Sequence, residues 1–152
     1  MLKKTTTLCL FLFSLSPLLF ALDEPSALSF FNRVQELAQA FDPSVADLYA
    51  DSATISTRRI FADGSEKNLT VSGSQYKALV RNLMPVAKAR GDTNKYSEVT
   101  ATTEGNRAKI KANRYSEMKN YTDPEYYVIL EQTASGDILV VEEHTMTMEK
   151  AQ

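Results

Sequence analysis

From Asp23 onward the chain shows a regular helical pattern. Between residues 23 and 41 the apolar residues recur every three or four positions, which places them on one side of an amphipathic helix. These residues are Ala27, Phe30, Phe31, Val34, Leu37, Ala38 and Phe41. Asp42 and Pro43 then supply a cap and a first-turn proline for a second, short helix. Its inner face is expected to hold Val45, Leu48 and Tyr49.

After Asp51 the pattern changes to extended residues and then returns to a helix. The segments 53–61 and 67–71, joined by a turn at 62–65, predict a β-hairpin. Ser72 and Gln75 have the spacing of a capping box, and the apolar residues behind them predict a third helix that ends at Gly91. Pro85 lies inside this helix and is expected to kink or split it, because its ring clashes with the preceding turn.

The rest of the chain reads as four strands, at 95–103, 107–119, 126–133 and 138–148. Short polar links join them, so consecutive strands are expected to be antiparallel neighbours in a meander. Strands this long must twist and bend, and a curved sheet over helices encloses a concave space. The sequence therefore predicts a single α+β domain with an internal pocket.

The first 21 residues have the pattern of a cleavable signal peptide. Lys3 and Lys4 precede the apolar run 8–20, and Ala21 is a small residue at the expected cleavage point. We therefore expect a mature domain, residues 22–152, in the periplasm or outside the cell, with no membrane attachment after cleavage. An uncleaved membrane anchor is the alternative. A lipoprotein is disfavoured because Cys9 lies early in the apolar run rather than just after it.

Charge and cysteine content narrow the classes of function. Of 17 basic residues the signal removes Lys3 and Lys4, so 15 basic residues face 19 acidic ones and the mature formal charge is −4. A nucleic-acid partner is not expected, since phosphate binding needs a basic face. Cys9, the only cysteine, lies in the signal, so a hydrophobic core rather than a disulfide must stabilise the mature domain.

The order of these elements resembles the nuclear transport factor 2-like (NTF2-like) superfamily of cone-shaped α+β domains. Residues 45–55 are similar to the second helix and first strand of its ketosteroid isomerases and SnoaL-like polyketide cyclases, and residues 136–145 to the last strand of many small members. The resemblance implies a cystatin-like fold, in which a long curved antiparallel sheet wraps around three helices from the N-terminal half.

The catalytic residues of the isomerases do not carry over. Aligned on residues 48–51, the family's carboxylate base on the first strand falls at Thr57, which cannot act as that base. The family's oxyanion-binding tyrosine falls at Arg33. The resemblance therefore implies a fold and leaves the activity open.

His144 and Arg114 are the candidate catalytic residues. His144 is the only histidine, and histidine is the side chain that ordinarily titrates near neutral pH. By strict alternation it shares a strand face with Glu142, Val140 and Ile138, although the sequence does not say which face lines the pocket. A polar residue at a strand end or a subunit interface is the simpler interpretation of His144.

Arg114 is the candidate charge inside the pocket. It alternates in phase with Ala108, Ile110 and Ala112, so it is expected to point inward with them. A buried guanidinium needs a carboxylate or a ligand, and Glu131 or Glu142 on neighbouring strands is the expected partner. An ion pair of purely structural value is the alternative.

Tyrosines complete the predicted pocket. Each combines an apolar ring with a polar hydroxyl, which suits the lining of a ligand cavity. The predicted ligand-binding residues are Tyr49, Tyr76, Arg114, Tyr127, Glu131, Glu142 and His144, and Tyr126 lies beside them. Asp47 and Asp51 could act as bases, but solvation at a helix end explains both. The sequence has no zinc-ligand cluster, phosphate loop or nucleophile elbow, so no metal and no cofactor are expected.

Two functions from different classes remain. One is non-catalytic binding of a small organic ligand or a protein partner in the cone. The other is a cofactor-free lyase, isomerase or cyclase acting on a small carbonyl compound, with Arg114 holding the oxygen and His144 or a carboxylate moving a proton. A homodimer is also expected, because residues 126–130 and 138–141 are apolar on both strand faces.

Overall fold

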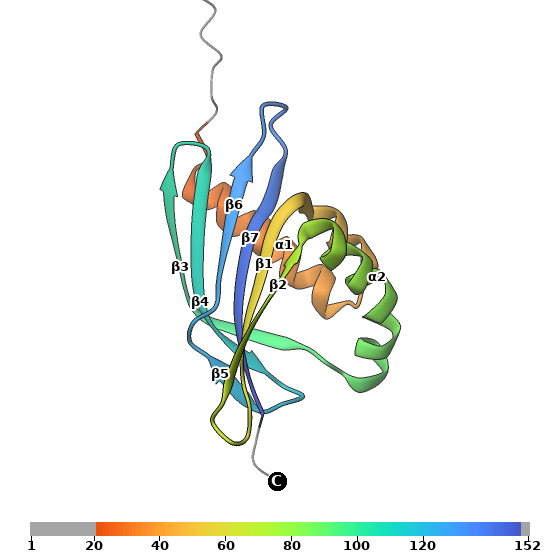
Figure 1. Ribbon diagram of the computed structural model, residues 1–152. Helices are drawn as coiled ribbons and strands as arrows, with labels where there is room; N and C mark the ends of the chain where they lie inside the picture. The colour runs from red at the N-terminus through yellow and green to blue at the C-terminus, as the bar shows by residue number, and fades with distance from the viewer. Residues whose placement is uncertain (1–20, 150–152) are drawn as a thin grey trace, which may run out of the picture.

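A computed structural model describes residues 21–149. The expected signal peptide, apart from Ala21, lies outside the described residues. Within residues 21–149 no helix is long and apolar enough to cross a membrane. The described part of the chain is an α+β domain in which the helices cover one face of a curved sheet (Figure 1).

The first helices form where the apolar pattern and the caps predict them. Helix α1, Glu24–Gln39, begins at Asp23, whose side chain accepts a hydrogen bond from the Ser26 amide at 2.7 Å. It buries Ala27, Phe31 and Val34 against the sheet. The second element, η1, Pro43–Leu48, is a 3₁₀ helix rather than an α-helix. A short capped 3₁₀ helix of this kind is typical of a connector.

The predicted hairpin is confirmed, and it leads directly into the long helix. Strand β1, Tyr49–Ile60, pairs antiparallel with β2, Glu66–Ser72. Helix α2, Gly73–Arg90, starts with the predicted capping box of Ser72 and Gln75 and ends at Gly91, which has a left-handed φ of 62°. The expected split at Pro85 is wrong, because the helix continues through it. Pro85 is exposed, so water can reach the backbone carbonyl that loses its partner there.

The second half forms the predicted antiparallel meander, with one additional strand. Its strands are β3, Asn94–Glu104; β4, Arg107–Ser116; β5, Tyr121–Asp123; β6, Tyr127–Gln132; and β7, Ile138–Met148. The segment predicted as one strand at 107–119 ends at Ser116, and a turn leads into the short β5, which pairs with β4. The sheet order is β2-β1-β7-β6-β4-β3.

The first and last strands lie side by side in the middle of the sheet. β1 pairs parallel with β7, with Ser56 opposite His144 and Thr57 opposite Thr145. This is the parallel pairing in a sheet whose other pairs are antiparallel. This pairing joins the N-terminal hairpin and the C-terminal meander into one sheet. In the core that the sheet covers, Phe31, Ile110, Leu130 and Val140 are almost completely buried.

A bulge in β7 changes which side chains share a face. Ile129 pairs with Glu142 and Leu130 with Val140, so Val141 has no opposite residue on β6. Val140 is fully buried and Glu143 is 7% exposed, although they are three positions apart. The extra residue at Val141 therefore shifts the alternation, and Val140 points to the same side as Glu143. The predicted grouping of Val140 with His144 is wrong for this reason.

Candidate functional site

A cavity of about 320 Å³ lies between the concave face of the sheet and the helices. Side chains from α1, η1 and α2 form one wall, and side chains from β1, β3, β4 and β7 form the other. Apart from Gln35 and Tyr76 this helical side is apolar, and its residues include Phe31, Val34, Ala38, Phe41, Val45, Val80, Met84 and Ala87. The cavity volume is in the range of sites for small organic molecules.

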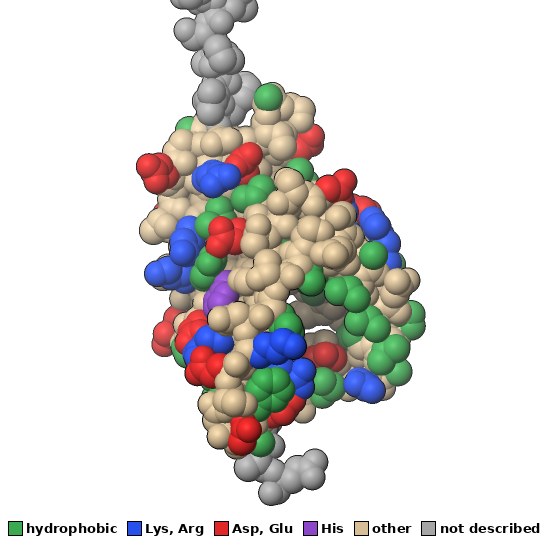
Figure 2. All heavy atoms as spheres, viewed as in Figure 1, with side chains coloured by type: hydrophobic (Ala, Val, Ile, Leu, Met, Phe, Trp, Pro, Cys, Tyr) green, Lys and Arg blue, Asp and Glu red, His purple; other side chains and the backbone are tan. Residues whose placement is uncertain are grey.

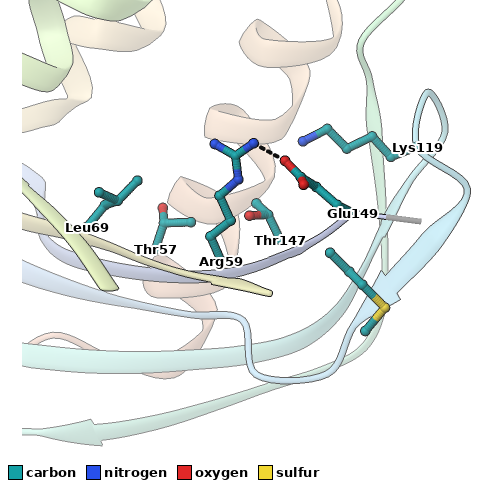
Figure 3. A pocket seen from close by; sticks show the side chains of 7 residues that line it. Thr57, Arg59, Leu69, Lys119, Thr147 and Glu149 are labelled. Atoms are coloured by element: carbon teal, nitrogen blue, oxygen red, sulfur yellow. Dashed lines mark hydrogen bonds and ion pairs between the residues drawn. The ribbon is translucent and has the colours of Figure 1, made fainter. Parts of the chain in front are cut away.

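An open groove of about 720 Å³ lies next to the cavity along the concave face of the sheet (Figure 3). Thr57 lines both spaces, so the groove continues the cavity along β1. Leu69, Thr147 and Met148 also line the groove, and an ion pair between Arg59 and Glu149 spans part of it. The cavity therefore has a route to the surface of the domain.

Glu143 is the central polar group of the cavity. Its side chain comes from β7 and is 7% exposed. The Tyr49 hydroxyl donates a hydrogen bond of 2.7 Å to its Oε2, and Tyr126 is a second hydrogen-bond partner of the carboxyl group. Burial raises the pKa of Glu143, and the Tyr49 hydrogen bond and the charge of Arg114 oppose that rise. The carboxyl group therefore holds its proton more tightly than an exposed glutamate does.

Four tyrosines surround this carboxyl group. Tyr49 and Tyr76 have ring centroids 4.8 Å apart, and those of Tyr96 and Tyr126 are 5.1 Å apart. All four line the cavity. Burial raises the pKa of each hydroxyl, most strongly for Tyr49 and Tyr126, so all four keep their protons at neutral pH. They are therefore hydrogen-bond donors set in apolar rings.

Arg114 lies in the cavity wall, as predicted, but its partner differs from the prediction. Its Nε and Nη2 donate to Oδ2 of Asp123 at 3.4 and 3.3 Å, Nη1 donates to Asn94 at 3.1 Å, and Nη2 also donates to the Met146 carbonyl at 3.2 Å. Asp123 is completely buried and also accepts the Met146 amide at 2.7 Å. These contacts engage Nε and both terminal nitrogens of Arg114, so its neighbours hold the guanidinium in place.

The expected pairing of Arg114 with Glu131 or Glu142 is wrong because both carboxylates lie on the outer face of the sheet. Glu131 pairs there with Arg107 at 2.7 Å. Glu142 accepts a hydrogen bond of 2.6 Å from the Tyr127 hydroxyl. Asp123 takes their place because β5, which the sequence pattern did not predict, pairs with β4 and sets Asp123 opposite Arg114.

His144 also lies on the outer face, in a polar cluster with Ser56, Glu125 and Tyr127. The Ser56 hydroxyl is 2.9 Å from its Nδ1, Oε2 of Glu125 is 3.8 Å from its Nε2, and the Tyr127 ring stacks on it with centroids 5.4 Å apart. Arg58 binds Glu125 from the same face. His144 and Arg114 therefore lie on opposite sides of the sheet and cannot act on the same substrate atom.

Among the predicted site residues, the structure brings Tyr49, Tyr76 and Arg114 together in the cavity. It places Tyr127, Glu131, Glu142 and His144 outside. Asp47 and Asp51 form surface ion pairs with Arg81 and Lys77, in line with their interpretation as solvated helix-end residues.

Sequence reasoning missed Glu143 and Tyr96. Glu143 could be found only by placing the bulge in the run Leu139-Val140-Val141, where three consecutive apolar residues are compatible with a change of phase. Tyr96 lies directly opposite Arg114 in the register of β3 and β4, so a correct strand pairing would have identified it.

Two further observations limit the chemistry of the site. Among residues 21–149, no group of three or more histidine, cysteine, aspartate or glutamate side chains is arranged to hold a metal ion. Thr57, at the position of the isomerase base, lines the cavity but is hydrogen-bonded to Thr145 at 2.9 Å. Asp92 and Glu143 are the carboxyl groups among the residues that line the cavity, and Glu143 is the buried one.

Comparison with known proteins identifies the fold. No protein-family model matches the chain, and no curated protein matches it. Among solved structures, an NTF2-like protein of unknown function from Pseudomonas putida KT2440 has a TM-score of 0.60 and 15% identity over 81% of this chain and 84% of its own.

Two more solved structures agree. An NTF2-like protein with a cystatin-like fold from Novosphingobium aromaticivorans has a TM-score of 0.55 and 13% identity over 85% of this chain and 84% of its own. An NTF2-like protein from Cytophaga hutchinsonii has a TM-score of 0.56 and 12% identity over 83% of this chain and 99% of its own. The predicted NTF2-like, cystatin-like fold is thereby confirmed.

Proposed function

We propose that this small NTF2-like domain binds a small organic ligand in the cavity, with Glu143 as the group that recognises it. The observation that carries the proposal is a buried carboxyl group, hydrogen-bonded to Tyr49 at 2.7 Å, at a cavity that opens to the surface. Burying a carboxyl group costs free energy unless hydrogen bonds compensate for the lost water, and a ligand can supply such bonds.

The hydrogen-bonding groups of the cavity favour an uncharged ligand that both donates and accepts hydrogen bonds. Asp123 neutralises Arg114, so the groups at the cavity that can hydrogen-bond with a ligand are the tyrosine hydroxyls and the carboxyl group of Glu143. Alcohols, ketones and amides fit these groups. An anionic ligand would meet the carboxyl groups of Glu143 and Asp92 in the cavity wall, where Arg114, the cationic lining residue, is already paired with Asp123.

Calorimetric titration with 1-butanol and with cyclohexanone tests the proposal. Glu143→Met removes the acceptor while keeping a side chain of similar size, so we expect about a tenfold loss of affinity, the equivalent of one hydrogen bond. Glu142→Met, at the next position on the outer face, is the matched control and should bind as wild type. Equal affinity in the two variants, or no binding by wild type, would refute the proposal.

A second candidate function is cofactor-free proton transfer next to a carbonyl. The specific observation is that burial raises the pKa of Glu143, a change that suits a carboxyl to acid–base work near neutral pH, while tyrosine hydroxyls around it could hold a carbonyl oxygen. In this mechanism Glu143, rather than His144, is the residue that moves the proton.

Deuterium exchange at the α-carbon of cyclohexanone, followed by NMR in D₂O, separates this activity from binding alone. Catalysis requires exchange above the buffer rate that Glu143→Gln abolishes and Glu142→Gln preserves. Exchange at the buffer rate by a wild-type protein that binds the ketone would leave binding as the function.

We also propose that the mature domain is exported and forms a homodimer through the outer face of the sheet. Ile129 and Leu139 are half-buried on that face and supply apolar contacts. Light scattering at micromolar concentration should give twice the monomer mass, and Ile129→Lys should reduce the measured mass to that of one monomer.

Export has its own test. N-terminal sequencing of protein from the periplasm or medium should begin at Leu22. A monomeric wild type, or an uncleaved chain in the cytoplasm, would refute the respective statement.

A further inference from the structure

The apolar surface of the cavity continues beyond it along α2. Val80, Met84 and Ala87 of this helix line the cavity. Leu79, Leu83 and Val86, each one position before a lining residue, are 46%, 54% and 45% exposed. At 100° per residue the exposed stripe adjoins the lining stripe, so the two form one wide apolar face that begins inside the cavity and ends in solvent.

Apolar residues also lie on the opposite side of the opening. Leu69 and Met148, 41% and 40% exposed, line the groove that Thr57 joins to the cavity. Figure 2 shows hydrophobic side chains gathered over α2 beside the hollow that separates this helix from the sheet. A compact molecule inside the cavity would leave these residues in water.

The polar groups, in contrast, gather at the sheet side of the cavity. Glu143 comes from β7, Arg114 from β4, and the tyrosines from β1, β3, α2 and the segment before β6, while the lining residues of α1, η1 and the rest of α2 are apolar except for Gln35. The site thus has a polar end and an apolar end, and the apolar end is continuous with the exposed stripe. A ligand that matches it has the same two ends.

We propose that the cavity takes an uncharged amphipathic molecule, whose hydroxyl or carbonyl head hydrogen-bonds with Glu143 and whose alkyl chain leaves between α2 and the sheet to cover Leu79 and Leu83. This inference rests on the proposed binding function and names the class of ligand. The alkyl chain of the ligand, rather than a second copy of the protein, covers the exposed stripe, because this stripe is continuous with the lining of the cavity.

A series of primary alcohols from 1-butanol to 1-decanol tests the proposal by calorimetric titration. Each methylene that is removed from water should strengthen binding about three- to fourfold, and the gain should continue to the longest member. A ligand enclosed by the cavity alone would instead stop gaining affinity once the chain fills the cavity. A plateau or a fall above 1-hexanol would overturn the proposal.

Variants of the exposed stripe test where the alkyl chain of the ligand lies. The double variant Leu79→Gln and Leu83→Gln should weaken 1-decanol binding about tenfold and leave 1-butanol unchanged, because a short chain does not reach the stripe. Ala78→Gln, on the solvent side of the same helix, is the matched control and should bind the whole series as wild type. Equal binding of 1-decanol by the double variant and the control would refute the path.

The outcomes separate this inference from the function on which it rests. If 1-butanol binds in a Glu143-dependent manner and longer chains add nothing, the binding function stands and the amphipathic ligand is refuted. If no alcohol binds, both are refuted. If the double variant changes the mass in light scattering and not the binding of 1-decanol, the stripe is a contact between copies and the proposal is overturned.

Discussion

Glu143 shows how strongly one residue's surroundings can differ from those of its neighbour. Glu142 and Glu143 are adjacent in the sequence, yet Glu142 lies on the outer face and Glu143 is 7% exposed inside the cavity. Burial raises the pKa of Glu143 above its ordinary value of 4.5. A carboxyl group that holds its proton more tightly in the folded chain favours folding at low pH.

The Glu143→Gln variant should therefore change the pH dependence of stability. In wild type, stability falls as the pH rises from 4.5 toward the higher pKa of the folded state, by about 1.4 kcal/mol for each unit between the two values. Glutamine cannot ionise, so the variant should gain stability relative to wild type over this range. Urea unfolding from pH 4 to pH 8 measures the difference, with Glu142→Gln as the matched control. Identical profiles for wild type and Glu143→Gln would contradict the prediction.

The pair Arg114 and Asp123 should be the most costly ion pair to break. Asp123 is completely buried and the Arg114 side chain is 12% exposed, so Asp123→Asn leaves a buried positive charge without its counter-charge. The expected loss is about 3–5 kcal/mol in the free energy of unfolding. Glu131→Gln breaks the pair with Arg107 on the outer face and should cost about 1 kcal/mol or less. Losses of equal size in urea unfolding would refute this ranking.

At the scale of the elements, the start of α2 packs closely against the backbone of β1. Gly73, the first residue of α2, is buried, and a Cβ added there would lie 1.8 Å from the Ala50 carbonyl oxygen. Since that oxygen belongs to the backbone, it cannot move aside as a flexible side chain could. The start of the helix is thus fixed against the strand that carries Tyr49.

Gly73→Ala should consequently destabilise the domain, although alanine is the better helix former. Forcing one methyl group into a packed site costs about 1–3 kcal/mol, and the contact with a backbone atom places this case at the upper end. Asn82→Ala, at an exposed position of the same helix, should change stability by about 0.5 kcal/mol or less. Thermal unfolding followed by far-UV circular dichroism compares the two. A Gly73→Ala variant as stable as wild type would show that the backbone can shift there.

The elements that depend on local sequence were predictable. α1, the hairpin and α2 follow from apolar periodicity and caps such as Ser72 with Gln75, which involve residues within a few positions of one another. The bulge at Val141 and the strand β5 depend instead on contacts with distant residues. For the site, the inward position of Arg114 follows from alternation along β4, whereas the inward position of Glu143 depends on the bulge.

At the scale of the whole molecule, the sheet is closed by residues far apart in the sequence. Tyr49 pairs with Val140 across the parallel β1–β7 ladder, and the Tyr49 hydroxyl bonds to Glu143, 94 residues away. Loops of this length must be closed before their contacts stabilise the fold. The topology therefore predicts slow folding for a domain of this size.

Refolding should take milliseconds to seconds rather than microseconds, as in proteins dominated by distant contacts. Stopped-flow dilution from urea can follow it through tyrosine fluorescence, since the chain has seven tyrosines and no tryptophan. A main phase complete within tens of microseconds would refute the argument from topology.

The central place of β7 also has a consequence for a chain that is still being made. Synthesis delivers β7 after all the other strands, yet β1 and β6 both need it as a neighbour. Before β7 is present, the chain can form only two separate pieces of sheet, and the Tyr49 hydroxyl lacks its hydrogen-bond acceptor, Glu143. Loss of residues 138–148 would thus leave two sheet halves with open edges, and the cavity would lack the carboxyl group of Glu143.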